Sequence, residues 1–203
     1  MSIIIAGIHT GIGKTVCSAV ICQTLGYDYW KPVQAGDWSN SDSIFIQKNV
    51  INPKTIVHPE TYKLVTPASP HYAAKLDGIE IKKEHFQLPE SKNNIVVETA
   101  GGLMSPLADN FLNIDLIEAL QLPVVLVSNN YLGSINHTLL SYEALKSRKI
   151  KTLGIVFDGV EATPSQEYIL SYAKLPLLFS IPQFPNLNAQ TISDFAKTIS
   201  IKL

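Results

Sequence analysis

A glycine-rich turn near the N-terminus constrains this chain more than any other feature. The residues Gly7-Ile8-His9-Thr10-Gly11-Ile12-Gly13-Lys14-Thr15 join the apolar run Ser2–Ala6 to the helical stretch Lys14–Leu25. A strand, a glycine-rich loop and a helix in this order are typical of a P-loop, which holds phosphate with backbone N–H groups and the helix N-terminus. Lys14 can then reach the β- and γ-phosphate oxygens, and the Thr15 hydroxyl can bind Mg²⁺. The first glycine lies one position earlier than in the usual motif, and a turn that binds nothing is the alternative.

The rest of the chain alternates short apolar runs with helical stretches. Further strands are expected at Tyr27–Val33, Ile95–Glu98, Val124–Ser128, Thr152–Phe157 and Leu177–Ile181. Further helices are expected at Ser41–Lys48, Ser134–Lys146, Thr163–Ala173 and Ile192–Ile199. Runs that are apolar on both faces are typical of a parallel sheet covered by helices on both sides.

We therefore predict a single P-loop α/β domain over residues 1–203, with a mostly parallel central sheet between two layers of helices. Residues 49–93 are less regular and contain five prolines. We expect them to form an excursion from the sheet, with short helices at Tyr72–Leu76 and Lys82–Phe86.

Composition excludes several other classes of protein. Lys and Arg number 16 against 17 Asp and Glu, so no overall basic field is available for nucleic acid or anionic lipid. No apolar run approaches the roughly 18 residues that span a bilayer, and the first residues do not resemble a secretory signal. With only Cys17 and Cys22 as cysteines, we expect a cytoplasmic protein with reduced thiols. Charged residues make up only 16%, which favours apolar surface buried between subunits.

Charged side chains stand where two of the expected strands end. Glu98 closes the run Ile95–Glu98, and the following Thr99–Gly102 can pass close to a phosphate. A P-loop requires an acid for Mg²⁺ at such a position, although Glu98 alone would be consistent with a solvated residue. Lys31 lies at the carboxyl end of the second strand, where open α/β sheets bind ligands, and it can stabilise a phosphoryl group in transfer; a solvated surface lysine is the alternative. Asp42, taken by itself, is best explained as an acid in the first turn of a helix.

Together these residues resemble the dethiobiotin synthetase family of biotin synthesis. The family's Gly-Thr-Asp-Thr-x-Val-Gly-Lys-Thr corresponds to Gly7–Thr15. Its Tyr-Lys-Pro-Val, Asn-Ser-Asp, Ser-Pro-His, Val-Glu-Gly-Ala-Gly-Gly and Leu-Gly-x-Ile-Asn-His motifs correspond, in the same order, to Trp30–Val33, Asn40–Asp42, Ser69–His71, Val97–Gly102 and Leu132–His137. The Gly-Lys-Thr is generic, whereas the later motifs together are specific.

The resemblance implies a reaction between 7,8-diaminononanoate, CO2 and ATP, with Mg²⁺. One amine forms a carbamate with CO2, and a carbamate oxygen attacks the γ-phosphate to give a carbamic–phosphoric anhydride. The second amine then closes the ureido ring and releases phosphate. Lys14 and Lys31 would hold the carbamate and γ-phosphate oxygens, whereas Thr15, Asp42 and Glu98 would carry the metal.

The resemblance also implies binding residues and a homodimer. The nucleotide contacts would be Thr10, Gly11, Ile12, Gly13, Lys14, Thr15, Val16, Asp42, Glu98, Thr99, Ala100, Gly101, Asp158, Gly159 and Pro182. The substrate contacts would be Ala35, Ser69, Gly133, Ser134, Ile135, Asn136 and Tyr168. The helix start at Gly133–Asn136 would reach the partner's substrate carboxylate, and Tyr168 would approach substrate from the other subunit; an ordinary packing tyrosine is the alternative for Tyr168.

Five departures from the family pattern limit the carry-over of roles. His9 replaces an aspartate, Gly11 replaces what is usually a glutamate, and Thr99 replaces a glycine. Ala35 replaces a serine or threonine that touches substrate, and Asp158 replaces the asparagine that recognises the base. The alternative function is a partitioning-type switch ATPase acting through protein partners, but such proteins carry a second lysine early in the P-loop and Gly7–Gly13 has none. A small-molecule kinase would need arginines in a lid, and Arg148 is the chain's only arginine.

Overall fold

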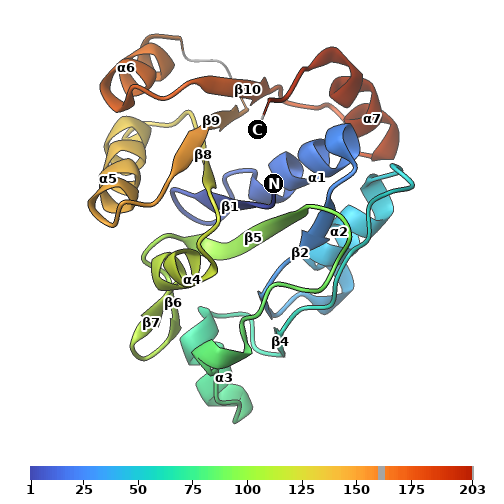
Figure 1. Ribbon diagram of the computed structural model, residues 1–203, viewed down its shortest axis with the longest axis vertical. Coiled ribbons are helices and arrows are strands. Elements are labelled where there is room, and N and C mark those ends of the chain that lie inside the picture. The colour runs from blue at the N-terminus through green and yellow to red at the C-terminus, as the bar shows by residue number, and fades with distance from the viewer. Residues whose placement is uncertain (160–162, 203) are drawn as a thin grey trace.

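The central sheet is parallel throughout. The computed structural model describes residues 1–159 and 163–202, and within them six strands form one sheet in the order β10-β9-β8-β1-β5-β2 (Figure 1). The strands are β1 (Ile3–Gly7), β2 (Asp28–Trp30), β5 (Ile95–Gly102), β8 (Val124–Asn129), β9 (Thr152–Asp158) and β10 (Leu177–Ile181). Because every pairing is parallel, the carboxyl ends of all these strands meet at one edge. The predicted parallel sheet is confirmed.

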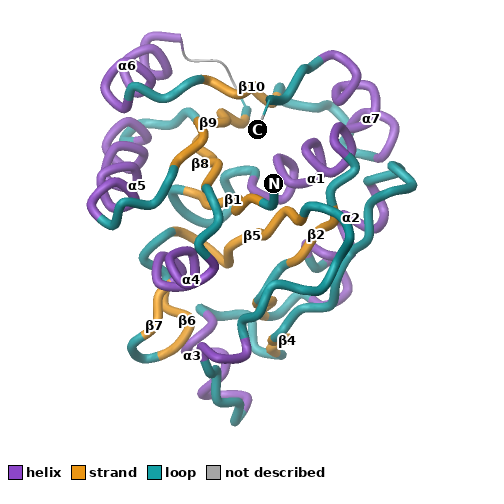
Figure 2. Tube along the Cα trace, viewed as in Figure 1, coloured by secondary structure: helices purple, strands orange, loops and turns teal. Residues whose placement is uncertain are grey.

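Helices cover both faces of this sheet, as predicted (Figure 2). One layer holds α1 (Lys14–Leu25), α2 (Asp42–Asn49) and α7 (Ala189–Thr198), and the other holds α4 (Asn113–Leu120), α5 (Ser134–Ser147) and α6 (Thr163–Ala173).

Strand β1 shows why the sheet needs both layers. Its residues alternate between the two faces: Ile3 and Ile5 pack in the core that contains α1, whereas Ile4 and Ala6 pack in the core that contains α5. All four are fully buried, so burial of an uninterrupted apolar run requires cover on each side.

The second strand is shorter than predicted. We expected one strand over Tyr27–Val33, but β2 ends at Trp30 and a separate strand, β3 (Val33–Ala35), follows Lys31-Pro32. Proline has no N–H to donate to the sheet, so the ladder with β5 cannot continue through it. Strand β3 instead pairs with β4 (Tyr62–Leu64) in a second, two-stranded sheet.

The irregular segment is more ordered than its sequence indicates. It holds β4, α3 (Pro70–Asp77) and a single 3₁₀ turn at Lys83–His85, so the helix expected over Lys82–Phe86 is only one turn. Another single 3₁₀ turn, at Trp38–Asn40, precedes α2. The hairpin β6 (Pro106–Ala108) and β7 (Phe111–Leu112) packs against the irregular segment, and together they bury a third apolar core. This lobe lies at the bottom of Figure 1, beyond the β2 edge of the main sheet.

A buried aspartate ties the irregular segment to the main sheet. Asp28, at the start of β2, is fully buried and accepts hydrogen bonds from the His58 Nε2 (3.0 Å), the Ser91 hydroxyl (2.7 Å) and the Ile56 backbone N–H (3.0 Å). These hydrogen bonds lower the pKa of Asp28 although burial opposes them. The carboxylate therefore anchors both ends of the excursion at the amino edge of the sheet, away from the P-loop.

Both cysteines, Cys17 and Cys22, are free and buried in α1, as expected. None of the helices in the described part of the chain is both long and apolar enough to cross a membrane.

Candidate functional site

The loop between β1 and α1 has the geometry of a phosphate cradle. Gly11 and Gly13 have φ of +72° and +86°, a left-handed conformation that side chains other than glycine rarely adopt. A Cβ at Gly13 would also collide with the carboxylate of Asp158, which lies directly against the loop. Lys14 is buried at the start of α1, and its Nζ donates to the His9 carbonyl across the loop (2.9 Å). Burial lowers the pKa of Lys14 to about 8.

Three predicted metal ligands from distant parts of the chain meet beside this loop. The Thr15 hydroxyl lies 2.8 Å from an oxygen of Asp42 and 2.8 Å from an oxygen of Glu98. A hydroxyl has one proton, so it can donate to only one carboxylate at a time, and the two acids share it. Two carboxylates and a hydroxyl are hard oxygen ligands of the kind that Mg²⁺ prefers. The donor set therefore fits the metal that the P-loop implies.

Elsewhere in the described residues, no group of three or more His, Cys, Asp or Glu is arranged to hold a metal. Magnesium commonly takes one or two carboxylates plus substrate phosphates, not a cage made of protein alone. A site of two acids and a threonine beside the phosphate cradle agrees with this preference of magnesium.

Two residues that orient Glu98 were not anticipated from the sequence. The Tyr29 hydroxyl donates to the second oxygen of Glu98 (3.0 Å). The Ser18 hydroxyl lies 2.8 Å from the same oxygen and 2.9 Å from the Lys14 carbonyl, so these two acceptors share its proton. Burial and the Glu98 charge raise the pKa of Tyr29, so its hydroxyl keeps the proton that it donates. Ser18 lies one helical turn after Thr15, a spacing that could have placed it on the same face of α1.

Lys31 lies between the two acids. Its Nζ contacts Asp42 directly and is 3.8 Å from an oxygen of Glu98. The residue is only 7% exposed, and this burial lowers the pKa of Lys31 while the Glu98 charge opposes the change. The two carboxylates offset part of the cost of removing this cation from water.

A cavity of about 430 Å³ opens beside Lys31. It brings together predicted residues from the P-loop, the second sheet and the strand end that follows Glu98: Thr10, Lys31, Ala35, Asp42, Ser69, Ala100 and Gly101. Its volume suits a small organic molecule. Gln34 and Ser105 also line it, and neither was proposed from the sequence as a site residue.

A second cavity, of about 320 Å³, lies on the other side of the P-loop. It joins Val16, Asp158, Gly159 and Pro182, all predicted to contact nucleotide, with apolar side chains of Phe184 and Leu187. Burial raises the pKa of Asp158 to about 6. A flat aromatic base fits such a pocket, in which apolar walls surround a few polar groups.

Other predicted residues lie elsewhere. The Thr99 hydroxyl donates to the Ile5 carbonyl (3.3 Å) inside the sheet, and the Ile12 side chain is buried in the α1 core. Either residue could contact nucleotide only through its backbone. Within one chain, Gly133, Ser134, Ile135 and Asn136 at the start of α5, and Tyr168 on α6, line neither of these two cavities in the described residues.

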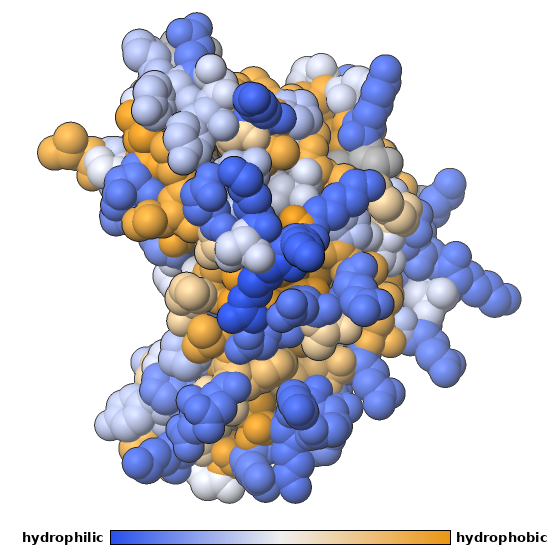
Figure 3. All heavy atoms as spheres, turned by 60° about the vertical axis from the view of Figure 1, so that its left-hand side comes forward, coloured by the Kyte–Doolittle hydropathy of each residue, from blue (hydrophilic) through white to orange (hydrophobic). Residues whose placement is uncertain are grey.

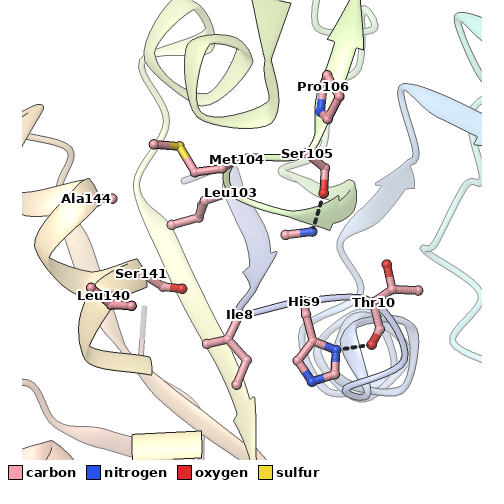
Figure 4. A pocket seen from close by; sticks show the side chains of 11 residues that line it. Ile8, His9, Thr10, Leu103, Met104, Ser105, Pro106, Leu140, Ser141 and Ala144 are labelled. Carbon is pink, nitrogen blue, oxygen red and sulfur yellow. Dashed lines mark hydrogen bonds between the residues drawn. The ribbon is translucent and has the colours of Figure 1, made fainter. Parts of the chain in front are cut away.

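A larger apolar cavity, of about 760 Å³, separates the P-loop from α5. Figure 4 shows Leu140 and Ser141 of α5 facing His9 across it, with Leu103 and Met104 along the upper rim. Leu140 and Met104 are 62% and 60% exposed, and Leu132 nearby in sequence is fully exposed. The face that contains α5 mixes apolar and polar side chains around a hollow (Figure 3).

Comparisons with known proteins agree with this geometry. A family model described as an AAA domain matches residues 1–191. The chain is 43% identical to an "ATP-dependent dethiobiotin synthetase BioD" from Christiangramia forsetii, over 100% of this chain and 97% of that protein. It is 38% identical to a protein of the same name from Chlamydia pneumoniae, over 96% of this chain and 87% of that protein.

Solved structures with a similar fold include P-loop ATPases. A ParA family ATPase from Chlorobium tepidum has a TM-score of 0.59 at 11% identity, covering 98% of this chain and 99% of that one. The septum site-determining protein MinD from Pyrococcus horikoshii has a TM-score of 0.59 at 15% identity, covering 98% of this chain and 96% of that one. At such identity these similarities establish the P-loop fold alone.

Proposed function

Since the chain belongs to the family of ATP-dependent dethiobiotin synthetases, we propose that it converts 7,8-diaminononanoate, CO2 and ATP to dethiobiotin, ADP and phosphate in biotin synthesis. The observation that carries this proposal is the position of Lys31. It borders the cavity of about 430 Å³ and contacts the acids that meet Thr15 at the phosphate cradle. An anion in that cavity and the γ-phosphate on the P-loop would share one buried cation.

The chemistry has three balanced steps. One amine of the substrate adds to CO2 and loses a proton, which gives a carbamate. A carbamate oxygen then displaces ADP from the γ-phosphorus, so an O–P bond forms and the bond to ADP breaks. Finally the second amine attacks the carbamate carbon; an N–C bond forms, the C–O bond to phosphate breaks, and the nitrogen loses a proton.

Two buried lysines supply most of the charge that these steps require. Lys14 and Lys31 would neutralise the oxygens of the γ-phosphate and the carbamate, and the backbone N–H groups from Gly11 to Thr15 would hold the phosphates. Both cations are largely buried. Away from water, their attraction for a developing negative charge is stronger. Holding both reactants in one orientation would contribute as much as any single charge.

Thr15, Asp42 and Glu98 would hold Mg²⁺. The ion would neutralise phosphate charge and fix the orientation of the phosphates. Ser18 and Tyr29 would keep the Glu98 carboxylate turned toward Thr15, since both bind its second oxygen.

We further propose that the active form is a cytoplasmic homodimer. Gly133–Asn136 and Tyr168 lie outside the Lys31 cavity of their own chain, and the α5 face exposes Leu132, Leu140 and Met104. A second copy on this face would cover these apolar side chains and bring the N-terminus of α5 to the partner's substrate carboxylate, a suitable end for an anion.

The test is whether the substrates are needed together. Purified protein should hydrolyse ATP rapidly only when both 7,8-diaminononanoate and bicarbonate are present, and dethiobiotin should appear in equal amount to ADP. A partition-type ATPase would hydrolyse ATP without the diamine. Rapid hydrolysis independent of the diamine would therefore contradict the proposed function.

A further inference from the structure

The wall of the Lys31 cavity contains a buried amide that the steps above do not use. Gln34 lies on β3, three residues after Lys31, and is 8% exposed. Its Nε2 donates to the Gly36 carbonyl (3.0 Å). Its Oε1 is buried and has no hydrogen-bond partner among the described residues. A buried acceptor without a partner is costly, so a ligand in the cavity gains affinity when the amide turns this oxygen toward it and the ligand supplies a donor.

We propose that the Gln34 Oε1 accepts a hydrogen bond from the amine of the substrate that closes the ring. This inference rests on the proposed function and names a binding residue for it. The cavity contains the cation Lys31 and the carboxylate of Asp42, already paired to each other, so an ammonium ion gains little there. A neutral amine has N–H groups to donate and matches a neutral acceptor.

The chemistry explains why an amide suits this position better than a carboxylate. The attacking nitrogen must be uncharged, because an ammonium has no lone pair with which to form the N–C bond. An amide oxygen can take one N–H and leave the lone pair free, whereas a carboxylate favours the protonated amine. Gln34 would therefore favour substrates that carry this second amine, and would favour the amine in its uncharged form.

Two substitutions separate these roles. Gln34→Met keeps the length of the side chain but removes the amide oxygen. It should raise the dissociation constant of the diamine about five- to twentyfold, and it should leave nucleotide affinity within about twofold of wild type. Gln34→Glu should leave diamine affinity near wild type or improve it, but lower kcat by about tenfold or more, because the bound amine is then protonated. Gln87→Met, an exposed glutamine of the same lobe, is the matched control and should change neither value.

The measurement is calorimetric binding of the diamine, and of an analogue in which the ring-closing amine is replaced by hydrogen. Wild type should bind the analogue more weakly than the diamine, and Gln34→Met should lose most of this difference. An equal difference in both proteins would overturn the inference, as would a nucleotide affinity that falls in parallel with diamine affinity. A wild-type protein that binds no diamine would refute the proposed function itself, whereas wild-type binding unchanged by Gln34→Met refutes only the role of Gln34.

Discussion

Replacing Asp158 with asparagine should stabilise the protein, and the gain should grow with pH. Asp158 lies against Gly13 of the P-loop, and burial raises its pKa from 3.8 to about 6. The folded protein therefore holds this proton more tightly than the unfolded chain does. Stability is highest while the carboxyl is protonated in both states, and it falls as the pH rises from about 4 through 6. Asparagine is neutral at every pH and avoids this loss.

The size of the effect follows from the change in pKa. A rise from 3.8 to about 6 corresponds to about 3 kcal/mol above pH 6 as an upper bound. The Asp158 side chain is only partly buried, so water screens its charge and we expect about 1–2 kcal/mol. Between pH 4.5 and pH 8 the advantage of Asp158→Asn over wild type should increase by roughly 1 kcal/mol.

Urea unfolding of both proteins at pH 4.5 and pH 8 measures this difference. Asp109→Asn, which changes an exposed aspartate of the β6–β7 hairpin, serves as the control and should show no such growth. If the advantage of Asp158→Asn is the same at both pH values, the burial of the carboxylate does not destabilise the fold and the reasoning fails.

Three further predictions concern the proposed reaction. Lys31→Gln should lower turnover by about 10²-fold or more while the protein remains folded by circular dichroism, because the charge acts mainly in the transition state; near-normal turnover would remove Lys31 from the mechanism. Mixing inactive Lys14→Ala and Asn136→Ala proteins should restore part of the activity, because one site of a mixed dimer would be intact; a fully active monomer in light scattering would contradict the shared site. In the base pocket a carboxylate only accepts, so Asp158 cannot donate to N7 of adenine, and kcat/KM for GTP and CTP should lie within about tenfold of that for ATP; a preference for ATP above a hundredfold would contradict this.

The sequence predicted the main sheet because its signals are local. The uninterrupted apolar runs at residues 3–6 and 124–127 mark the buried parallel strands β1 and β8, and the glycines of the P-loop mark the turn into α1. Such features depend on residues adjacent in the chain, so one sequence is enough to identify them.

The residues that support the site were harder to predict. Tyr29 reaches Glu98, 69 residues away in sequence, only because β2 pairs with β5. The residues of neither strand indicate which strand will be its neighbour. Gln34 is buried because β3 leaves the main sheet to pair with β4. Thr99 stands where the family pattern has a glycine and was expected to contact nucleotide, but its hydroxyl donates to the Ile5 carbonyl within the sheet. These outcomes depend on tertiary pairing, which local propensity cannot supply.

The division of the second strand at Pro32 places the phosphate loop and the wall of the Lys31 cavity in two separate parts of the structure. Up to Trp30 the chain belongs to the sheet that carries the phosphate loop, and from Val33 it belongs to the lobe with its own apolar core. Mutations that reshape that lobe can alter which molecule fits beside Lys31, while the phosphate loop and its acids stay in register. The lysine at the junction is common to both parts. On the proposed function, substitutions in this lobe would change which substrate is bound, while the phosphate loop and its acids keep their geometry.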